Sequence, residues 1–270
     1  MDELAYSSRM VNWAPLGKLL FILALMIVGL ITDSLVVPMI TFAIGISLMA
    51  YSTNLKIPLI LALAIGEAIL ILLIGCGMIS IMGSDTDPGL WDGYILWIKV
   101  HMTEGSFNQA WLIFFRAVAG VTLMLAFACS TPIPHLAQAF RSIRCPPEIT
   151  ELIVLIYRYA FLLLERFLVM LDAAQCRLGY NGAMTAMRSY GGAMAGTFIF
   201  SMELAEKSEA ALACRNYDGY FPVFRMPQKM SVAWAVVSIG LAVALYFVGQ
   251  YTGDWINMAK LFAPLFGWSI

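Results

Sequence analysis

Charged residues are scarce in this sequence. They make up 12% of the 270 residues, whereas hydrophobic residues make up 61% and the mean hydropathy is +0.83. A soluble domain carries about 25% charged residues, so this chain has too few to cover a surface that faces water. The composition therefore predicts an integral membrane protein, because lipid solvates the apolar surface that water does not.

The motifs of several enzyme classes are also absent. The sequence has no G-x-x-x-x-G-K-[ST] loop and no H-E-x-x-H motif, which argues against P-loop ATP binding and against a zinc-protease site. Its only histidines are His101 and His135, which we expect on opposite sides of the membrane in ordinary polar or packing roles. The five cysteines form no C-x-x-C pair, and the 17 methionines are scattered through apolar segments. We therefore expect no catalytic residue, no metal ligand set and no cofactor in this chain.

Apolar stretches predict about five transmembrane helices. They cover about Leu16–Ile31, Ser34–Tyr51, Ile57–Met82, Gln109–Ser130 and Ser231–Tyr251. The first two are slightly short for an upright span of about 20 residues, and the polar turn at Asp33 predicts that they form a helical hairpin. The segment 83–106, with aromatic residues suited to a membrane interface, is expected to be a loop. The fold class is therefore an all-α integral membrane protein.

Between the fourth and the last span the sequence becomes more polar. Pro146 and Pro147 fit a helix start, and no Gly or Pro follows until Gly179, which predicts about 45 Å of helix. A second helical unit, interrupted at Gly191–Gly192, is expected to end near Arg215. The chain thus divides into 1–130 with about four spans, 131–230 as a cytoplasmic or interfacial helical region, and 231–270 as a last span and tail.

The distribution of positive charge predicts the orientation. Ten of the 16 Lys and Arg residues lie between Arg141 and Lys229, whereas the 83–106 loop has only Lys99 against four acids. Positive residues collect in cytoplasmic loops. We therefore expect the 131–230 region and the N-terminus in the cytoplasm, and the 83–106 loop and the C-terminus outside.

Two charges interrupt the predicted spans, Glu67 and Arg116. Charges within a bilayer are costly and are usually paired. Because the third and fourth spans are joined by one loop and run antiparallel, we expect an intramembrane ion pair between Glu67 and Arg116 that fixes helix packing.

The most informative pattern is a pair of similar helix ends. The segments 172–180 and 209–219 each place small residues and one arginine in the last helical turn, and Cys-Arg recurs at Cys176 and Cys214. Gly179 and Asn216 are the residues expected to stop the two helices. A terminal arginine can bind a partner carboxylate through two hydrogen bonds, although arginine also favours helix ends for local reasons.

These ends resemble the short Ala-Arg-Gly-like motifs of the transmembrane T component of energy-coupling factor transporters, in particular the CbiQ (EcfT) type that serves cobalt or nickel uptake. The N-terminal segment 2–9 and the segment 15–20 are also similar to that type. Two departures are Asn216, where the family usually has Gly, and Leu178, which stands between Arg177 and Gly179.

The resemblance implies a non-catalytic scaffold of an ABC importer for cobalt or nickel in a prokaryotic inner membrane. Two cytoplasmic ATPase subunits would bind the ends of long coupling helices and hold the ATP, and a separate CbiM-like membrane S subunit would bind the metal, with room for a small accessory membrane subunit. Nucleic acid is not an expected partner. The residues expected to dock the ATPases are Ala174, Gln175, Arg177, Gly179, Ala213, Arg215, Asn216, Tyr217, Asp218 and Gly219. The alternatives are a self-sufficient permease or channel and, with less support, a membrane-embedded enzyme.

Overall fold

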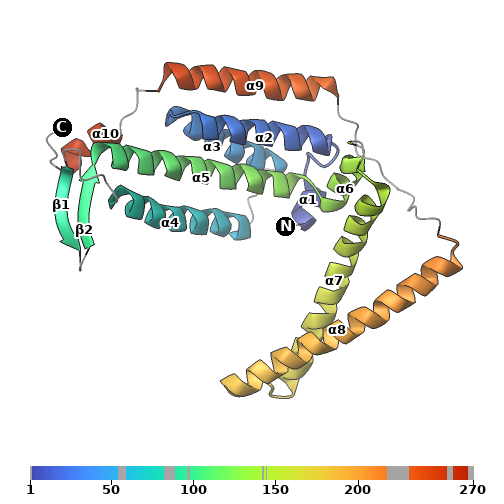
Figure 1. Ribbon diagram of the computed structural model, residues 1–270. Helices are drawn as coiled ribbons and strands as arrows, with labels where there is room; N and C mark the ends of the chain where they lie inside the picture. Colours follow the sequence, from blue (N-terminus) through green and yellow to red (C-terminus); the bar gives the residue numbers. More distant parts are fainter. Residues whose placement is uncertain are drawn as a thin grey trace. The chain divides into compact units, whose positions relative to one another are not determined.

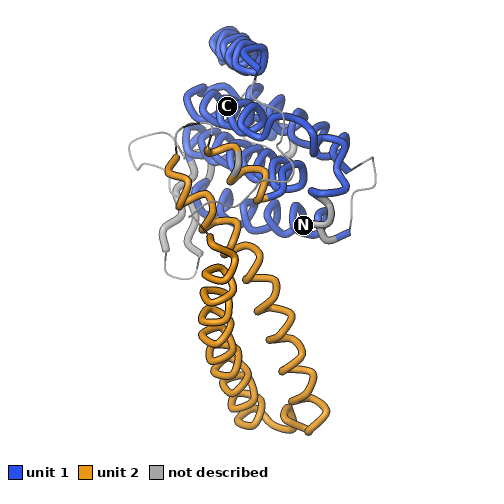
Figure 2. Tube along the Cα trace, turned by 90° about the vertical axis from the view of Figure 1, so that its right-hand side faces the viewer, with its two compact units in different colours: residues 1–132, 227–270 blue, residues 133–226 orange. Residues whose placement is uncertain are grey.

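A computed structural model describes residues 2–53, 59–81, 89–95, 98–141, 143, 145–217, 231–253 and 258–266. The chain forms two compact units, one made of residues 1–132 with 227–270 and the other of residues 133–226 (Figure 2). The segments 82–88 and 218–230 are among those outside the described residues.

The first unit is a bundle of apolar helices with one small hairpin of strands (Figure 1). Its elements are α1 (Asp2–Ser7), α2 (Pro15–Ile31), α3 (Val36–Ser52), α4 (Leu59–Ile81), β1 (Gly89–Ile95), β2 (Ile98–Thr103), α5 (Glu104–Ser130), α9 (Val232–Tyr251) and α10 (Met258–Phe266). Among the described residues, three helices are long and apolar enough to cross a membrane, within α4, α5 and α9. Helices α2 and α3 are apolar but have only 17 residues each. The all-α membrane fold class is confirmed.

The segment expected to be a loop contains an antiparallel hairpin. Strands β1 and β2 pair Asp92 with His101 and Tyr94 with Lys99. Aromatic and β-branched residues are common in both strands, and these residue types favour extended backbone. The interface aromatic Trp97 lies outside the described residues.

Helix α5 is the centre of the first unit. It packs against α1, α2, α3, α4 and α10, and it begins with a capping box in which Thr103 and Ser106 exchange hydrogen bonds. Its last carbonyl groups are held by neighbouring helices, because Lys18 Nζ donates to Ser130 O at 2.7 Å and Ser52 Oγ donates to Cys129 O at 3.2 Å. Lys18 is therefore a buried contact between α2 and α5.

Helices α2 and α9 run parallel, although they are far apart in the sequence. A Cβ placed on Gly17 would lie 2.8 Å from Trp234, and one placed on Gly249 would lie 2.0 Å from Thr32 Cγ2. Both ends of the pair therefore pack closely through a glycine, which is typical of helix contacts in membranes. The ends are also joined at Ser34, whose Oγ lies 3.0 Å from Thr252 Oγ1.

The second unit consists of α6 (Ile133–Arg141), α7 (Pro147–Cys176) and α8 (Ala183–Cys214). Helix α6 packs on α7, and α7 and α8 form an antiparallel hairpin. Two side-chain contacts join these helices. The Tyr159 hydroxyl donates to Ser208 Oγ at 2.7 Å, and the Arg166 guanidinium carbon lies 5.2 Å from the centre of the Phe200 ring. The expected interruption at Gly191–Gly192 is wrong, because α8 is continuous over 32 residues. Each glycine costs the helix only about 1 kcal/mol relative to alanine, which the packing on α7 can offset.

Candidate functional site

The two similar helix ends adopt the same backbone conformation. At the end of α7, Leu178 N donates to Gln175 O at 3.0 Å and Gly179 N donates to Ala174 O at 2.8 Å. At the end of α8 the corresponding donors are Asn216 N, to Ala213 O at 3.1 Å, and Tyr217 N, to Leu212 O at 3.2 Å. Each end is a Schellman motif, in which these two bonds close the last turn.

The arginines occupy equivalent positions in the two motifs. Arg177 and Arg215 are the C-cap residues of α7 and α8, with φ of −95° and −93°. Both side chains are exposed, and the described residues contain no ion pair to either one. The fold thus presents the same arginine geometry twice.

The residue that ends α7 is not the expected one. Leu178 and Asn216 are the left-handed residues, with φ of 57° and 51°. Gly179 therefore does not stop α7, and its structural counterpart is Tyr217. Asn adopts this conformation readily, whereas for Leu it costs about 1–2 kcal/mol. No sequence pattern indicates a strained Leu here, and it was missed as a site residue.

Gly179 is required by close packing. A Cβ at this position would lie 2.6 Å from Ser189 Oγ and 2.8 Å from Ala174 O. Ser189 Oγ donates to Gly179 O at 2.9 Å, and the rings of Tyr180 and Tyr190 lie 5.5 Å apart. The first two turns of α8 therefore hold the end of α7 in place.

The end of α8 is held by the start of α7. Tyr217 donates a hydrogen bond from its hydroxyl to the buried carboxylate of Glu151. This bond, with some desolvation, raises the pKa of Tyr217 to about 12, so the hydroxyl keeps its proton at neutral pH. Glu151 was not among the expected site residues. Asp218 and Gly219 lie outside the described residues.

The two ends are far apart. Helix α8 has 32 residues and separates them, which corresponds to about 48 Å at 1.5 Å per residue. One end adjoins the α7–α8 turn and the other adjoins the start of α7. One groove on a partner therefore cannot bind both arginines.

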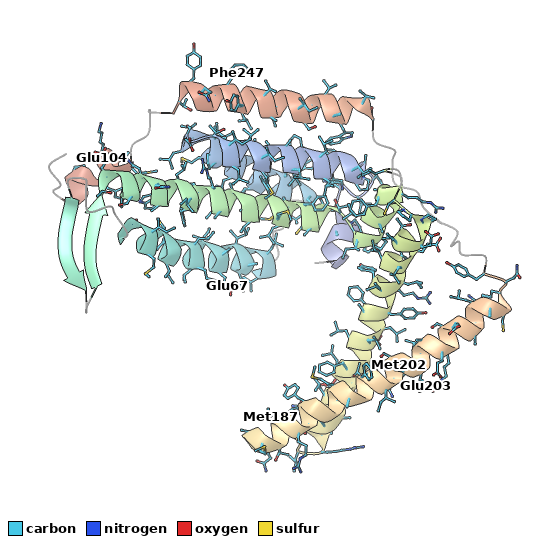
Figure 3. The ribbon with its side chains drawn as sticks, viewed as in Figure 1. Glu67, Glu104, Met187, Met202, Glu203 and Phe247 are labelled. Carbon is cyan, nitrogen blue, oxygen red and sulfur yellow. The ribbon has the colours of Figure 1, made fainter. Side chains whose placement is uncertain are left out.

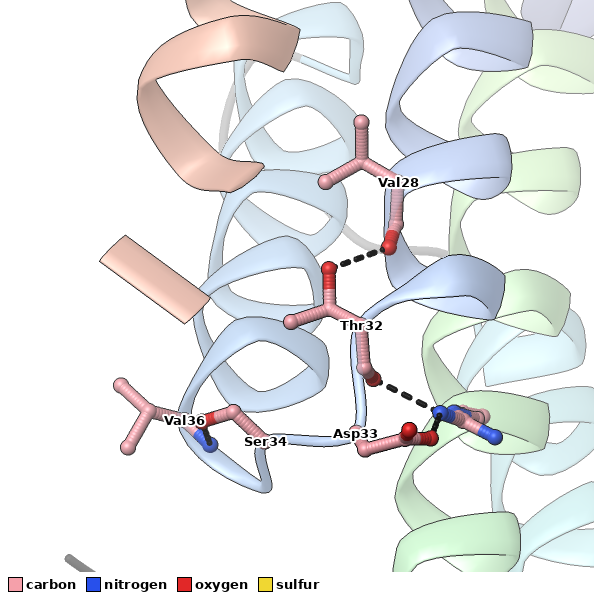
Figure 4. Close-up of polar contacts among 6 residues, drawn as sticks. Val28, Thr32, Asp33, Ser34 and Val36 are labelled. Atoms are coloured by element: carbon pink, nitrogen blue, oxygen red, sulfur yellow. Dashed lines mark hydrogen bonds and ion pairs between the residues drawn. The ribbon is translucent and has the colours of Figure 1, made fainter. Parts of the chain in front are cut away.

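The expected Glu67–Arg116 pair is wrong. Arg116 Nη2 donates to Thr32 O at 2.7 Å and to Asp33 Oδ1 at 3.0 Å, at the turn between α2 and α3 (Figure 4). Glu67 is exposed and points away from α5 (Figure 3). The physical reason is that α2 ends at the depth of Arg116, so an open carbonyl and a carboxylate were already available there.

Within the described residues, no three His, Cys, Asp or Glu side chains gather in a way that could hold a metal ion. His101 is in β2 and His135 is in α6, in different compact units. The expected absence of a cofactor stays a prediction.

Comparison with known proteins points to one family. A family model described as cobalt transport protein, CbiQ, matches residues 7–225. An uncharacterised protein of Methanocaldococcus jannaschii is 26% identical over 268 residues, covering 93% of this chain and 94% of its own length. A protein of Methanocorpusculum labreanum described as a putative fused cobalt transport protein CbiMQ is 26% identical over 231 residues, which is 81% of this chain and 36% of that protein. The cobalt transport protein CbiQ of Salmonella typhimurium is 24% identical over 231 residues, or 82% of this chain and 98% of its length.

Proposed function

This chain belongs to the CbiQ family of cobalt transport proteins, as a membrane-embedded T component, and on that premise we propose that it couples two cytoplasmic ATPase subunits to a separate metal-binding membrane subunit. The observation that carries the proposal is the repeated Schellman end with its exposed arginine. A membrane subunit of a cobalt transport system that contacts one ATPase would need only one such end.

The separation of the two ends supports a pair of motor subunits. About 48 Å of helix lies between Arg177 and Arg215, so each arginine would meet a different subunit. An arginine at a rigid helix end is suited to a carboxylate in a partner groove, because its planar fork forms two parallel hydrogen bonds. Movement of the two ATPases on binding and hydrolysing ATP would then move the two ends of the α7–α8 hairpin.

A metal-binding partner is supported by the fused relative and by α8. The Methanocorpusculum protein is described as CbiM and CbiQ in one chain, so a CbiM-like subunit is the proposed neighbour of this chain. Met187 and Met202, labelled on α8 in Figure 3, are 74% and 55% exposed. Flexible methionines suit an apolar surface that has to stay in contact with a moving partner.

Orientation and catalysis follow from the same proposal. The second unit would lie in the cytoplasm, with the N-terminus on that side of a prokaryotic inner membrane, as the positive charges predict. Hydrolysis would take place in the ATPase subunits, and this chain would contribute force transmission only. Cobalt is the metal in the family's description, and the choice between cobalt and nickel would rest with the partner that binds it.

The test is retention of the ATPase subunits by the tagged chain, co-expressed with them and with the S subunit. We expect Arg177→Glu and Arg215→Glu each to remove about half of the retained ATPase and the double variant to remove nearly all of it, because a reversed charge in a desolvated ion pair is strongly unfavourable. Lys207→Glu is the matched control, since Lys207 is an exposed cation on α8 whose side chain is 70% exposed. Normal ATPase retention and uptake in the double variant would overturn the docking role.

A further inference from the structure

The membrane bundle contains an apolar cavity that the coupling mechanism does not use. It has a volume of about 360 Å³ and lies between α2, α3 and α5, the three adjacent helices of the bundle in Figure 1. Its wall includes Gly29, Pro38, Ile113, Ala117 and Gly120, and Arg116 is its only charged residue. The volume is within the range of small-ligand sites, about 300–1,000 Å³.

Glycines create this space. A Cβ on Gly29 would meet no atom within 4 Å, and a Cβ on Gly120 would meet only Met26 Cε at 4.0 Å. Both glycines line the cavity, and an alanine Cβ at either position would meet no close atom. Close helix packing therefore does not require a glycine at these two positions, whereas it does at Gly17 and Gly249.

Arg116 gives the cavity a positive charge. Both of its hydrogen bonds, to Thr32 O and Asp33 Oδ1, use Nη2, and among the described residues no acceptor binds Nη1. Its Nε is buried without a hydrogen-bond partner. The side chain of Asp33 is 92% exposed, so its carboxylate is well solvated and neutralises the guanidinium only in part. Nη1 of Arg116 can therefore still donate a hydrogen bond to an oxyanion.

The charge of Arg116 lies beside a polar turn of the bundle. Arg116 is level with the end of α2 at Ile31, where α9 also ends and Ser34 meets Thr252. Along α5 the residues that line the cavity run from Ile113 past Arg116 to Leu123, and Leu123 is seven residues or about 10 Å from Arg116. The cavity thus has its one charged group beside the polar α2–α3 turn and apolar walls on the side of Leu123, and a phospholipid likewise has a charged group next to an apolar chain.

We propose that this cavity binds one phospholipid, with an acyl chain between α2, α3 and α5 and the phosphate on the Arg116 guanidinium. A metal cation does not fit the site, because its one charged residue is positive. A polar solute does not fit either, because the hydroxyl of Thr41, the other polar side chain of the wall, already donates to Pro38 O at 2.9 Å. Lipid in the cavity would hold the α2–α3 hairpin against α5, the central helix.

The test is native mass spectrometry of the full chain, purified in detergent and supplied with phosphatidylglycerol. Gly120→Leu fills the cavity, and Gly240→Leu is its control, because Gly240 also has no atom within 4 Å of a Cβ but lies on the exposed face of α9. We expect one retained phosphatidylglycerol in the natural chain and in Gly240→Leu, and at least a tenfold lower occupancy in Gly120→Leu. Equal occupancy in all three would overturn the proposal.

The charge at the site is tested separately. Arg116→Gln should lower phosphatidylglycerol occupancy, whereas Asp33→Asn should raise it, because it removes a competing carboxylate from the same guanidinium. Asp33→Asn controls for misfolding, because a misfolded variant would not bind more phosphatidylglycerol than the natural chain. Unchanged occupancy in both variants would exclude the phosphate contact. Binding of an apolar partner helix in place of lipid would appear as loss of the lipid when the S subunit is added, and would also overturn the proposal.

Discussion

Leu178 is the residue whose conformation is least expected from its type. It has φ of 57° and its side chain is 74% exposed, so it is both strained and without apolar cover in the described part of the chain. The Schellman motif that closes α7 requires this conformation, and residues with such strain often lie at functional sites. Because Leu178 directly follows Arg177, we expect it to be an apolar contact in the proposed ATPase groove.

Replacing Leu178 separates stability from docking. Leu178→Gly should stabilise the α7–α8 turn by about 1 kcal/mol, because glycine adopts a positive φ without strain. The same change should weaken ATPase retention, because the exposed side chain is lost. Hydrogen exchange across residues 171–182 measures the first effect and co-purification measures the second. Asn216→Gly is the control. Hydrogen exchange at the end of α8 should change by only a few tenths of a kcal/mol in this variant, since Asn tolerates this conformation. Unchanged ATPase retention in Leu178→Gly would remove Leu178 from the docking surface.

At the scale of helices, α2 and α9 pack closely at both ends, and α9 ends level with the turn that follows α2. The contact between Gly249 and Thr32 fixes how far the two helices slide past each other. The same Thr32–Asp33 turn of α2 also binds Arg116 of α5, so it contacts both α9 and α5.

Gly249→Ala should disrupt this register. Its Cβ would lie 2.0 Å from Thr32 Cγ2 and 3.0 Å from Val37 Cγ2, and overpacking of this kind costs about 1–3 kcal/mol. We expect a lower midpoint of thermal unfolding in detergent, read from size-exclusion profiles after heating. Gly240→Ala, where no atom lies within 4 Å of the added Cβ, should be neutral or slightly stabilising. Equal midpoints for the two variants would mean that α9 is not fixed against α2.

At the scale of the whole chain, the question is whether it moves metal by itself. The described residues hold no cluster of metal ligands, and the cavity between α2, α3 and α5 is lined by the cationic Arg116. The positive charge of Arg116 opposes a path for a divalent cation through this cavity.

If a separate subunit binds the metal, as proposed, the chain alone should not conduct cobalt. Purified protein in vesicles with a cobalt-sensitive dye inside should give no entry of Co²⁺ above protein-free vesicles, because a cation in a low-dielectric path without anionic ligands pays a large desolvation cost. Adding the ATPase subunits, the S subunit and ATP should restore entry. Rapid entry with the chain alone would support the permease alternative instead.

The amino-acid sequence by itself determined the helical membrane class, the extent of the apolar helices and the two arginine-bearing helix ends. These features depend on local properties, namely apolar residues in runs of membrane length, prolines at helix starts and small residues before a stop. The positions of Arg177 and Arg215 as C-caps could be read in this way because capping involves residues only a few positions apart.

Only the tertiary structure decided which partners the isolated groups have. Arg116 binds Asp33 and not Glu67, because the relative depth and rotation of three helices select the carboxylate, and hydropathy carries no record of either. Tyr217 reaches Glu151 only when α7 and α8 pack antiparallel, and Leu178 is left-handed because the turn into α8 requires it. Contacts between residues distant in the sequence depend on how whole helices pack, and that is why the scarce charges of this chain were easy to find but could not be paired from the sequence.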